Sequence, residues 1–409
     1  MKLYPHQETS RQFLLDAKRA ILADQPRVGK TLPTAAAAAE HLPAMVVCPA
    51  IAKSVWERAF QAINADLKVT VVNGKKEAQG LSKCDVVIIN YDVVQHVSPT
   101  LYNKFCTLVL DESHRIKSAD AIRTKSCMAM MKEVERVYCL SGTPIPNRPI
   151  ELWPLLNGLG IYRSGYYEFA TRYARMWKAP WGLDVSGASN LPELKALMRP
   201  YVLRRKKEDV FTDYSEPQVS LITFDLPIDK REQEFDADAL VENPNALMAF
   251  EGLAELMREA GLRKVKPAAE FIENLLDSED QVVVFVHHKD VAAQLAEALK
   301  KHKPAVITGD TPRKQRDTYI DEFQAHKRRI IVGNIAAMSE GVDLSAADTV
   351  VFVEATWQTS ALEQASSRIE NISKQSFRPL IYLLTIRASL DHNVLARVLR
   401  KLNVIDQII

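Results

Sequence analysis

The segment ILADQPRVGKT, residues 21–31, places glycine, lysine and threonine at the end of a short apolar run. An alanine-rich stretch at 35–39 follows, with the composition of a helix interior. A loop with glycine before Lys-Thr, between a strand and a helix N-terminus, is the arrangement that cradles nucleotide phosphates. Lys30 would supply a charge to the β- and γ-phosphates, and Thr31 would ligate Mg²⁺. The strict pattern G-x-x-x-x-G-K-S/T fails because Asp24 stands at its first glycine. A bare GKT also occurs often by chance, so the loop needs a partner motif.

Two adjacent carboxylates supply that partner. The segment TLVLDESH, residues 107–114, is a bare apolar run that ends in Asp111 and Glu112. Such a run suits a buried strand whose carboxyl end lies beside the phosphate loop. Asp111 would hold Mg²⁺ through water, and Glu112 would polarise the attacking water molecule. An exposed turn after a strand, which is the alternative, would not require so apolar an approach. The two motifs in this order predict a P-loop NTPase.

Both motifs require strands and helices that alternate along the chain. Continuous apolar, β-branched runs of four to six residues occur in two sets, separated by stretches with helical spacing. This pattern is typical of parallel sheets covered by helices on both faces, and it predicts two doubly wound α/β lobes. The predicted strands are 45–48, 69–72, 86–89, 107–110 and 136–140 in the first set and 282–286, 304–307, 329–333, 349–353 and 380–385 in the second.

The segment 211–228 is the predicted junction between the lobes, because it carries turn residues and follows the basic run RRKK at 204–207. We therefore expect one domain at residues 1–214 and a second at 225–409. The helical stretch 229–275 would open or decorate the second domain. A length of 409 residues suits two domains of roughly 200 residues each.

Composition narrows the class of protein. Apolar residues make up 47% and charged residues 25% of the chain, as in a globular protein. With a formal net charge of only +2, a nucleic-acid surface must be a local groove. No apolar run approaches the roughly 20 residues of a membrane span, and the N-terminal residues turn polar at once, unlike a signal peptide. The five cysteines form no CxxC pair, so we expect reduced thiols in a cytosolic protein rather than disulfides or zinc.

Further segments occur in the order of a known family. DESHRIKS at 111–118 is similar to DEAHRIKN, the DEAH-box segment of the SNF2-type ATPases of superfamily 2, and DQPRVGKT aligns with their DEMGLGKT. In this alignment Asp24 is the expected residue, whereas Arg27 stands where the family has glycine. The other matching segments are LYPHQ (3–7), VVCPAIAKSVWERAF (46–60), NYD (90–92), LSGTPIPNRPIELWPLLN (140–157), YVLRRKKEDV (201–210), VVVFVHHKDV (282–291), ITGDTPRKQRDTYIDEFQ (307–324) and IAAMSEGVDLSAADTVVFVEATW (335–357). The resemblance covers nearly the whole chain. Within the family, the sequence is most similar to the annealing-helicase-like branch.

The resemblance implies two tandem RecA-like lobes with an ATP cleft between them, and ATP and Mg²⁺ as cofactors. Gln7 inherits the position that reads adenine, and Gly29 belongs to the phosphate loop. The second lobe would supply arginines across the cleft, which would link hydrolysis to lobe motion. The residues implied on the second lobe's side of the nucleotide are Gly341, Asp343, Gln364 and Arg368.

The same resemblance implies a groove for double-stranded DNA. Contacts from loops to the phosphate backbone would give affinity with little sequence preference. The implied DNA contacts are Lys53, Ser54, Arg148, Thr308, Gly309, Asn334 and Trp357.

Several of these segments also have an ordinary structural interpretation. Trp357 suits core packing, and the RRKK run at 204–207 suits a solvated helix face or a localisation signal. The Ser-Gly-Thr-Pro segment at 141–144 would also form a simple turn. His287 and His288 have no companion at ligand spacing, so we expect no metal site there.

One position departs from the family pattern. The segment EQASSRIENISKQ, residues 363–375, parallels QAxxRxxRIGQ, in which two arginines lie three residues apart. Arg368 matches the first arginine, but Asn371 occupies the second, which resembles an arginine finger worth about 10³–10⁵ in rate. Asparagine is neutral, short and unable to give a bidentate contact. Either Arg368 acts alone, or Lys374 or Arg378 substitutes, or hydrolysis is impaired while ATP and DNA binding survive.

The leading interpretation is an ATP-dependent translocase on double-stranded DNA that remodels or anneals, with turnover reduced by Asn371. A strand-separating superfamily 2 helicase is the second interpretation, although no separating pin is evident. The third is an ATP-gated DNA clamp without efficient turnover. The chain is expected to be a monomer in the cytosol of a bacterium or of a virus-infected host, and nothing in the sequence identifies a protein partner.

Overall fold

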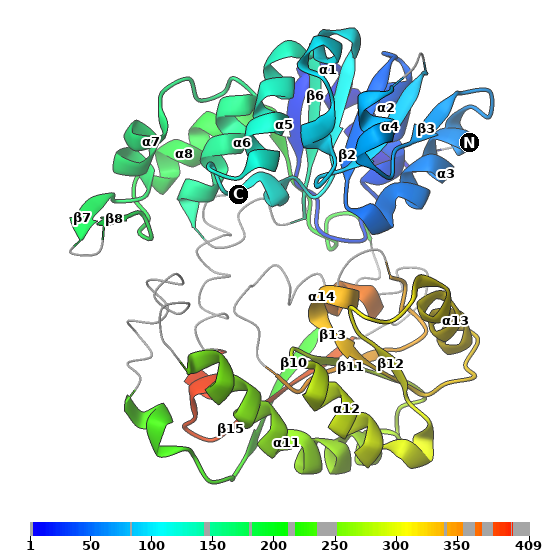
Figure 1. Ribbon diagram of the computed structural model, residues 1–409, viewed down its shortest axis with the longest axis vertical. Helices are drawn as coiled ribbons and strands as arrows, with labels where there is room; N and C mark the ends of the chain where they lie inside the picture. The colour runs from blue at the N-terminus through cyan, green and yellow to red at the C-terminus, as the bar shows by residue number, and fades with distance from the viewer. Residues whose placement is uncertain are drawn as a thin grey trace. The chain divides into compact units, whose positions relative to one another are not determined.

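The computed structural model contains two compact units, one within Met1–Val210 and one within Phe211–Asn403, here called lobe 1 and lobe 2 (Figure 1). Each lobe is built on a parallel β-sheet, so the expected fold class of two tandem parallel-sheet α/β lobes is confirmed. The residues that the structure describes are 3–81, 84–142, 148–179, 182–211, 217–234, 252–338, 342–354, 365–369, 379–393 and 395.

The sheet of lobe 1 has the strand order β3-β4-β2-β5-β6-β1-β9, and neighbouring strands run parallel. Its strands are β1 (Arg19–Leu22), β2 (Ala44–Cys48), β3 (Val69–Val71), β4 (Val86–Asn90), β5 (Thr107–Leu110), β6 (Arg136–Leu140) and β9 (Val202–Leu203). β2, β4 and β5 are buried along their whole length, because helices cover both faces of the sheet. All five strands predicted for this half are present.

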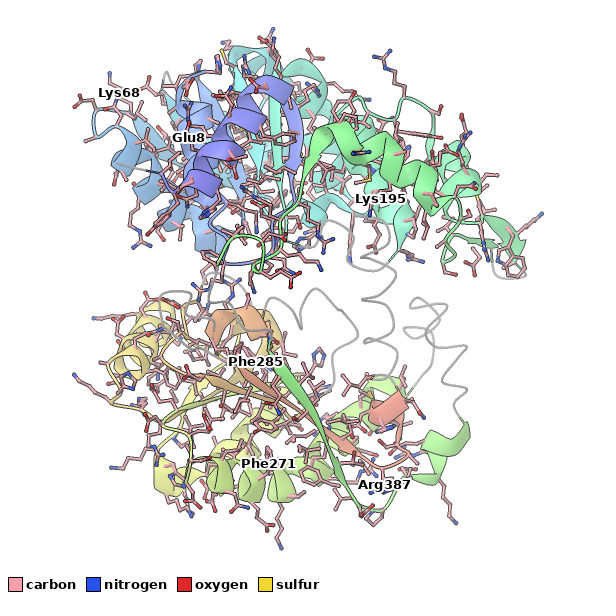
Figure 2. The ribbon with its side chains drawn as sticks, turned by 180° about the vertical axis from the view of Figure 1, so that it is seen from behind. Glu8, Lys68, Lys195, Phe271, Phe285 and Arg387 are labelled. Carbon is pink, nitrogen blue, oxygen red and sulfur yellow. The ribbon has the colours of Figure 1, made fainter. Side chains whose placement is uncertain are left out.

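Helices pack on lobe 1 through alternate residues of each strand. Met45 and Val47 of β2 join the cluster that contains α5 and α6, whereas Ala44, Val46 and Cys48 join the cluster that contains α1, α2 and α3. α1 lies across the sheet in the view of Figure 2. The helices of lobe 1 are α1 (Pro5–Ala17), α2 (Thr31–Ala39), α3 (Lys53–Ile63), α4 (Lys75–Gln79), α5 (Ile122–Glu133), α6 (Trp153–Gly158), α7 (Tyr166–Tyr173) and α8 (Leu191–Met198), and β7 (Trp177–Ala179) and β8 (Gly182–Asp184) form a separate antiparallel pair.

The sheet of lobe 2 has the order β10-β15-β14-β11-β13-β12, again with parallel neighbours. Phe285 of β11 stacks on Phe352 of β14 on one face of this sheet, whereas Phe271 of α11 packs edge-on against Tyr382 of β15 on the other (Figure 2). The elements are β10 (Gln218–Phe224), α11 (Leu253–Leu275), β11 (Val282–Val286), α12 (Lys289–Ala298), β12 (Ala305–Ile307), α13 (Arg313–Gln324), β13 (Ile330–Asn334), α14 (Ile335–Met338), β14 (Thr349–Phe352) and β15 (Leu380–Ile386).

The segment 211–228, expected to be only a junction, contains β10. Gln218–Phe224 pairs with β15 along its whole length, from Gln218 opposite Leu380 to Phe224 opposite Ile386, so the expectation was wrong for these residues. The segment is an edge strand, and polar residues and the exposed side chains of Val219 and Leu221 hide its strand pattern. Within the described residues, no helix is both long enough and apolar enough to span a bilayer.

Candidate nucleotide and DNA site

Three neighbouring strands of lobe 1 bring the predicted nucleotide residues to one edge of the sheet. β5, β6 and β1 are adjacent and parallel, and they lead into Asp111, Ser141 and the loop at 23–30. The carboxyl edge of such a sheet is where ligands bind in open α/β folds. The segments touch one another, since a Cβ added to Gly142 would lie 2.9 Å from the Pro26 ring. Gly142 and the Pro26 ring of the phosphate loop are therefore packed together.

The Lys30 ammonium lies at the centre of this edge. Its Nζ donates to the carbonyl oxygens of Asp24 at 2.7 Å and Gln25 at 3.2 Å. Burial lowers the pKa of Lys30, although the nearby charges of Glu112, Asp24 and Asp111 act in the opposite direction. Thr31 is the first residue of α2. A bound phosphate would compete with the two loop carbonyls for the ammonium.

Side chains from the first turn of α1 form hydrogen bonds with the phosphate loop. Gln7 donates from Nε2 to the Gly29 carbonyl at 3.3 Å, and its Oε1 accepts the Tyr4 N–H at 3.1 Å. The His6 ring nitrogen Nε2 lies 3.1 Å from the Val28 carbonyl oxygen. Gly29 has φ +88°, in the region that favours glycine, and a Cβ there would lie 2.7 Å from Gln7 Nε2. The loop conformation therefore depends on both Gly29 and Gln7.

Gly29→Ala is expected to weaken ATP binding by about tenfold, because the strain of a positive φ and the clash with Gln7 displace the loop. Affinity for a fluorescent ATP analogue would measure this. Gly160→Ala is the matched control, since Gly160 also has a positive φ of +74° but an added Cβ would meet nothing within 4 Å. Unchanged affinity in Gly29→Ala would show that the loop tolerates a side chain there.

Asp111 donates its backbone N–H to the Val47 carbonyl at 2.8 Å and accepts three further hydrogen bonds. Its Oδ2 accepts the Trp56 indole N–H at 2.8 Å, its Oδ1 accepts the Glu112 N–H at 3.0 Å, and its carbonyl oxygen accepts the Tyr91 hydroxyl at 2.7 Å. Burial, followed by the charge of Glu112, raises the pKa of Asp111 to about 7, against the opposing effects of Trp56 and Lys30. The carboxylate is thus oriented by its hydrogen bonds, and it takes up a proton more readily than a solvent-exposed aspartate does.

The oxygen donors at this edge suit a hard cation. The Asp111 carboxylate and the Thr31 hydroxyl would hold Mg²⁺, and phosphate oxygens and water would complete the six ligands that this ion prefers. Within the described residues, no group of three or more His, Cys, Asp or Glu side chains is arranged to bind a metal by itself. The protein groups therefore fit a metal ion that arrives with the nucleotide.

Divalent-metal affinity in the presence of ADP is expected to fall about tenfold from pH 8 to pH 6. The proton and the metal compete for Asp111, whose pKa is raised to about 7, so binding is strong above that pH and weakens below it. Calorimetric titration with Mg²⁺ at fixed ADP would measure the effect. Asp111→Asn is the control, which corrects for protonation of the nucleotide. An equally steep pH dependence in that variant would assign the proton to another group.

His114 connects Glu112 to the next strand. His114 Nδ1 lies 3.4 Å from Glu112 Oε2 and 3.0 Å from Ser141 Oγ. Ser141 is fully buried at the end of β6. Ser141 therefore does more than form a turn, because it belongs to a chain of polar contacts that reaches the predicted catalytic carboxylate.

Arg205 is a residue of this site that the sequence analysis missed. Its guanidinium and its backbone N–H bind both carboxylate oxygens of Asp24, and its Nη1 donates to the His6 carbonyl at 2.6 Å. The run at 204–207 follows β9 and is not helical, so its interpretation as a solvated helix face was wrong. The one sequence feature that could have indicated Arg205 is Asp24, a carboxylate within the phosphate-loop pattern that would need a counter-ion if buried. This basic run helps to hold the loop that it flanks.

Arg205→Met is expected to destabilise the protein by about 3–5 kcal/mol, because it leaves the Asp24 carboxylate buried without its counter-ion. Side-chain exposures of 15% for Arg205 and 1% for Asp24 support this size of effect. Arg172→Met is the control, since Arg172 and Glu193 are 51% and 46% exposed and such pairs contribute at most about 1 kcal/mol. Chemical denaturation would measure both. Equal, small losses would contradict the assignment, as would the absence of any recovery when Asp24→Asn is added to Arg205→Met.

The predicted DNA contacts of lobe 1 differ in their exposure. Lys53 is only 7% exposed, and its ammonium donates to the Val72 carbonyl at 2.5 Å and to Asn73 Oδ1 at 3.3 Å. Burial lowers the pKa of Lys53. Ser54 and Arg148 are half-buried. A contact between Lys53 and DNA therefore requires its side chain to leave the Val72 carbonyl.

In lobe 2, predicted residues also collect at the carboxyl edge of the sheet. Thr308 and Gly309 follow β12, and Asn334 ends the neighbouring β13, where its amide donates to the His287 carbonyl at 2.6 Å. The Leu344 N–H donates to the Arg368 carbonyl at 3.0 Å, so Asp343 and Arg368 lie on adjoining segments. The predicted residues Gly341, Trp357, Gln364 and Asn371 lie outside the described residues.

A second cluster that the sequence analysis missed lies beside Asn334. Glu354, which is 3% exposed, accepts the backbone N–H groups of His287 and His288 at 2.8 and 2.9 Å, and its Oε1 lies 2.6 Å from His288 Nδ1. Burial lowers the pKa of His287. The carboxylate fixes the turn between β11 and α12, and no spacing rule links it to the two histidines.

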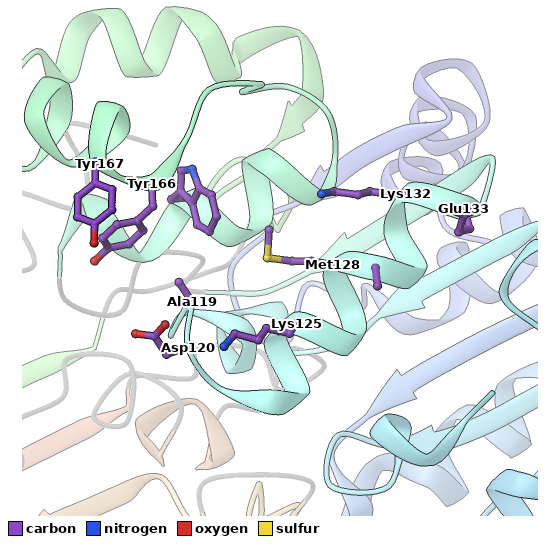
Figure 3. Close-up of a pocket in the computed structure, with 10 residues that line it drawn as sticks. Ala119, Asp120, Lys125, Met128, Lys132, Glu133, Tyr166 and Tyr167 are labelled. Carbon is purple, nitrogen blue, oxygen red and sulfur yellow. The ribbon is translucent and has the colours of Figure 1, made fainter. Parts of the chain in front are cut away.

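A separate groove of about 610 Å³ runs along α5 of lobe 1. Figure 3 shows Tyr166 and Tyr167 at one end of it and Lys132 and Glu133 at the other. Among the residues that the structure describes, none of those predicted to bind ATP or DNA lines this groove. It is therefore a feature distinct from the edge that carries Lys30.

Comparison with known proteins adds independent information. The profile of the SNF2-related domain matches residues 6–253, and that of the helicase conserved C-terminal domain matches 266–372. The SWI/SNF-related matrix-associated actin-dependent regulator of chromatin subfamily A-like protein 1 of Xenopus tropicalis is 29% identical over 99% of this chain and 45% of its own length. The DNA annealing helicase and endonuclease ZRANB3 of Mus musculus is 27% identical over 98% of this chain and 40% of its own length.

Among solved structures, the SWI2/SNF2 ATPase core of Sulfolobus solfataricus in complex with dsDNA has a TM-score of 0.49 and 21% sequence identity. The alignment covers 96% of this chain and 89% of that one. This chain spans less than half the length of the curated relatives described above.

Proposed function

Since the chain belongs to the SNF2-related family, as the match over residues 6–253 shows, we propose that it is a DNA-dependent ATPase that moves along double-stranded DNA. The observation that carries this proposal is the meeting of Lys30, Asp111 and Ser141 at the ends of three neighbouring parallel strands. A P-loop without its paired carboxylates would support nucleotide binding only. The helicase C-terminal match at 266–372 supports a second motor lobe.

In the proposed mechanism, each nucleotide-site residue of lobe 1 has its own role. Lys30 and the backbone N–H groups of the loop bind the β- and γ-phosphates and neutralise the charge that develops on them. Glu112 polarises the attacking water, and His114 links its carboxylate to Ser141. Asp111 and Thr31 would hold Mg²⁺, which would neutralise negative charge on the phosphates. Arg205 and Gln7 keep the loop in its binding conformation.

For DNA, we propose contacts to the phosphate backbone from Ser54, Arg148, Thr308, Gly309 and Asn334, and we keep Trp357 as a further DNA contact proposed from the sequence. Backbone contacts predict binding that is independent of sequence and weakens steeply with salt. By analogy with the relative named as a DNA annealing helicase, remodelling or annealing of duplexes is the proposed outcome rather than strand separation.

The test is the steady-state ATPase rate without DNA, with single strands and with duplexes of several sequences. The proposal expects stimulation by duplex, little dependence on sequence and loss of stimulation at high salt. It fails if no form of DNA changes the rate or the affinity for ATP. Displacement of a labelled strand from a forked duplex would instead support a strand-separating helicase.

Asn371 favours one second candidate, an ATP-gated DNA clamp. Its neutral side chain stands at the position that resembles an arginine finger, so ATP binding without efficient turnover is a coherent alternative. DNA affinity that changes with ATP while no phosphate is released would support the clamp. Rapid phosphate release by the unmodified chain would exclude it.

A further inference from the structure

Trp56 contacts Asp111, the carboxylate predicted to bind the metal, from a different strand–helix segment of lobe 1. It lies on α3, which follows β2, whereas Asp111 follows β5, the strand beside β2 in the sheet. Its indole N–H donates to Asp111 Oδ2 at 2.8 Å, and the side chain is fully buried. A buried indole needs an acceptor, but here the acceptor is a charged group with a proposed function rather than a backbone carbonyl.

The geometry leaves Asp111 able to bind a ligand. Each carboxylate oxygen can accept more than one hydrogen bond. Oδ1 accepts from the Glu112 N–H and Oδ2 from Trp56, and each keeps capacity for a metal ion or its water. Among the residues that the structure describes, Trp56 is the hydrogen-bond donor that fixes Oδ2. Removing it would leave the Glu112 N–H as the remaining hydrogen bond that limits rotation of the carboxylate about its χ2 angle.

Packing makes this contact rigid. Trp56 packs beside Phe60, with 6.2 Å between ring centroids, inside the cluster that joins α1, α2 and α3 to the sheet. A large side chain locked by its neighbours can hold a second group in one orientation, as the outer partners of metal ligands do. Trp56 therefore transmits the position of α3 to Asp111.

We propose that Trp56 is a positioning residue, which orients Asp111 for divalent-metal binding and makes that orientation depend on the position of α3. The second part rests on the proposed function, because Ser54, a proposed DNA contact, lies in the first turn of the same helix. A shift of this turn on DNA binding would move the indole, and with it the Asp111 carboxylate. DNA stimulation of turnover is then expected to depend on Trp56.

The test replaces the indole N–H alone. Trp56→benzothienylalanine, introduced at this one position, keeps the bicyclic shape and exchanges N–H for sulfur, and Trp56→Phe is the encoded counterpart. Phe60→Leu is the matched control, because Phe60 is equally buried on the same helix but does not contact Asp111. Binding of Mn²⁺ in the presence of ADP is measured from the electron paramagnetic resonance signal of free Mn²⁺, and ATPase rates are measured with and without duplex.

Both Trp56 substitutions are expected to weaken Mn²⁺ binding by about ten- to a hundredfold and to lower DNA stimulation. Phe60→Leu should lower the melting temperature without changing Mn²⁺ affinity. The proposal is overturned if the benzothienylalanine variant, melting like the parent, binds Mn²⁺ as the parent does, or if the parent binds no Mn²⁺ with ADP. The metal measurement needs no turnover. A parent chain in which DNA changes neither the ATPase rate nor the affinity for ATP would refute the proposed function, while the role of Trp56 would still be decided.

Discussion

Asn371→Arg is expected to raise the DNA-stimulated ATPase rate by about 10³-fold, the lower end of what an arginine finger contributes. The γ-phosphate gains negative charge in the transition state, and a guanidinium supplies two donors and a permanent positive charge in a planar fork. Asparagine supplies neither the charge nor the fork. ATP affinity should change much less than turnover, because the arginine acts mainly on the transition state. Single-turnover phosphate release with saturating duplex would measure the change.

Asn371→Lys separates charge from geometry, because lysine restores the charge as a point without the fork. A rate between those of the parent and Asn371→Arg is expected. Adding Lys30→Ala to Asn371→Arg should remove the gained activity, which would show that it comes from this nucleotide site. A parent chain that already turns over rapidly with duplex would contradict the hypothesis, and would assign the finger to Arg368, Lys374 or Arg378.

Periodicity and motif order predicted the fold of this chain to within a residue or two at most strands. β5 was predicted at 107–110 and is Thr107–Leu110, and β11 was predicted at 282–286 and is Val282–Val286. Continuous apolar runs are reliable here because strands covered on both faces have no polar side. β10 was missed because an edge strand is only half covered and carries polar residues. The family resemblance is confirmed by the match over residues 6–253.

Partners within the site were much harder to predict than its motifs. Arg205 and Asp24 are 181 residues apart, and Trp56 and Asp111 are 55 apart. No periodicity relates such pairs, and a run of basic residues does not reveal whether its charges face DNA or a buried carboxylate. Lys53 illustrates the same difficulty, since its type and position suggested a phosphate contact while its ammonium lies on the Val72 carbonyl. The order of the motifs thus predicts which segments lie next to one another. Which atoms of those segments form contacts depends on side-chain packing, which the sequence pattern does not reveal.

Lys30→Ala is expected to reduce ATP turnover by about 10²–10³-fold or more, since one removed donor to developing charge has an effect of that size. The loss should be larger than for a peripheral cation, because Lys30 is buried at the edge where Asp111 and Glu112 also act on its pKa. Removing the ammonium also leaves the carbonyls of Asp24 and Gln25 without this donor. ATP affinity should fall together with turnover, because the lysine contacts the phosphates in the ground state as well.

Steady-state ATPase assays and equilibrium binding of a fluorescent ATP analogue would measure both effects. Lys30→Ala is added to the Asn371→Arg variant for this test, because the rate of that variant is expected to be high enough for a loss to be seen. Lys125→Ala, an exposed lysine of lobe 1 on the groove along α5, is the control and should leave both quantities unchanged. Duplex binding without nucleotide should survive in Lys30→Ala, because no proposed DNA contact involves this residue. If turnover survived while Lys125→Ala lost it, the nucleotide would have to bind outside the edge formed by β5, β6 and β1.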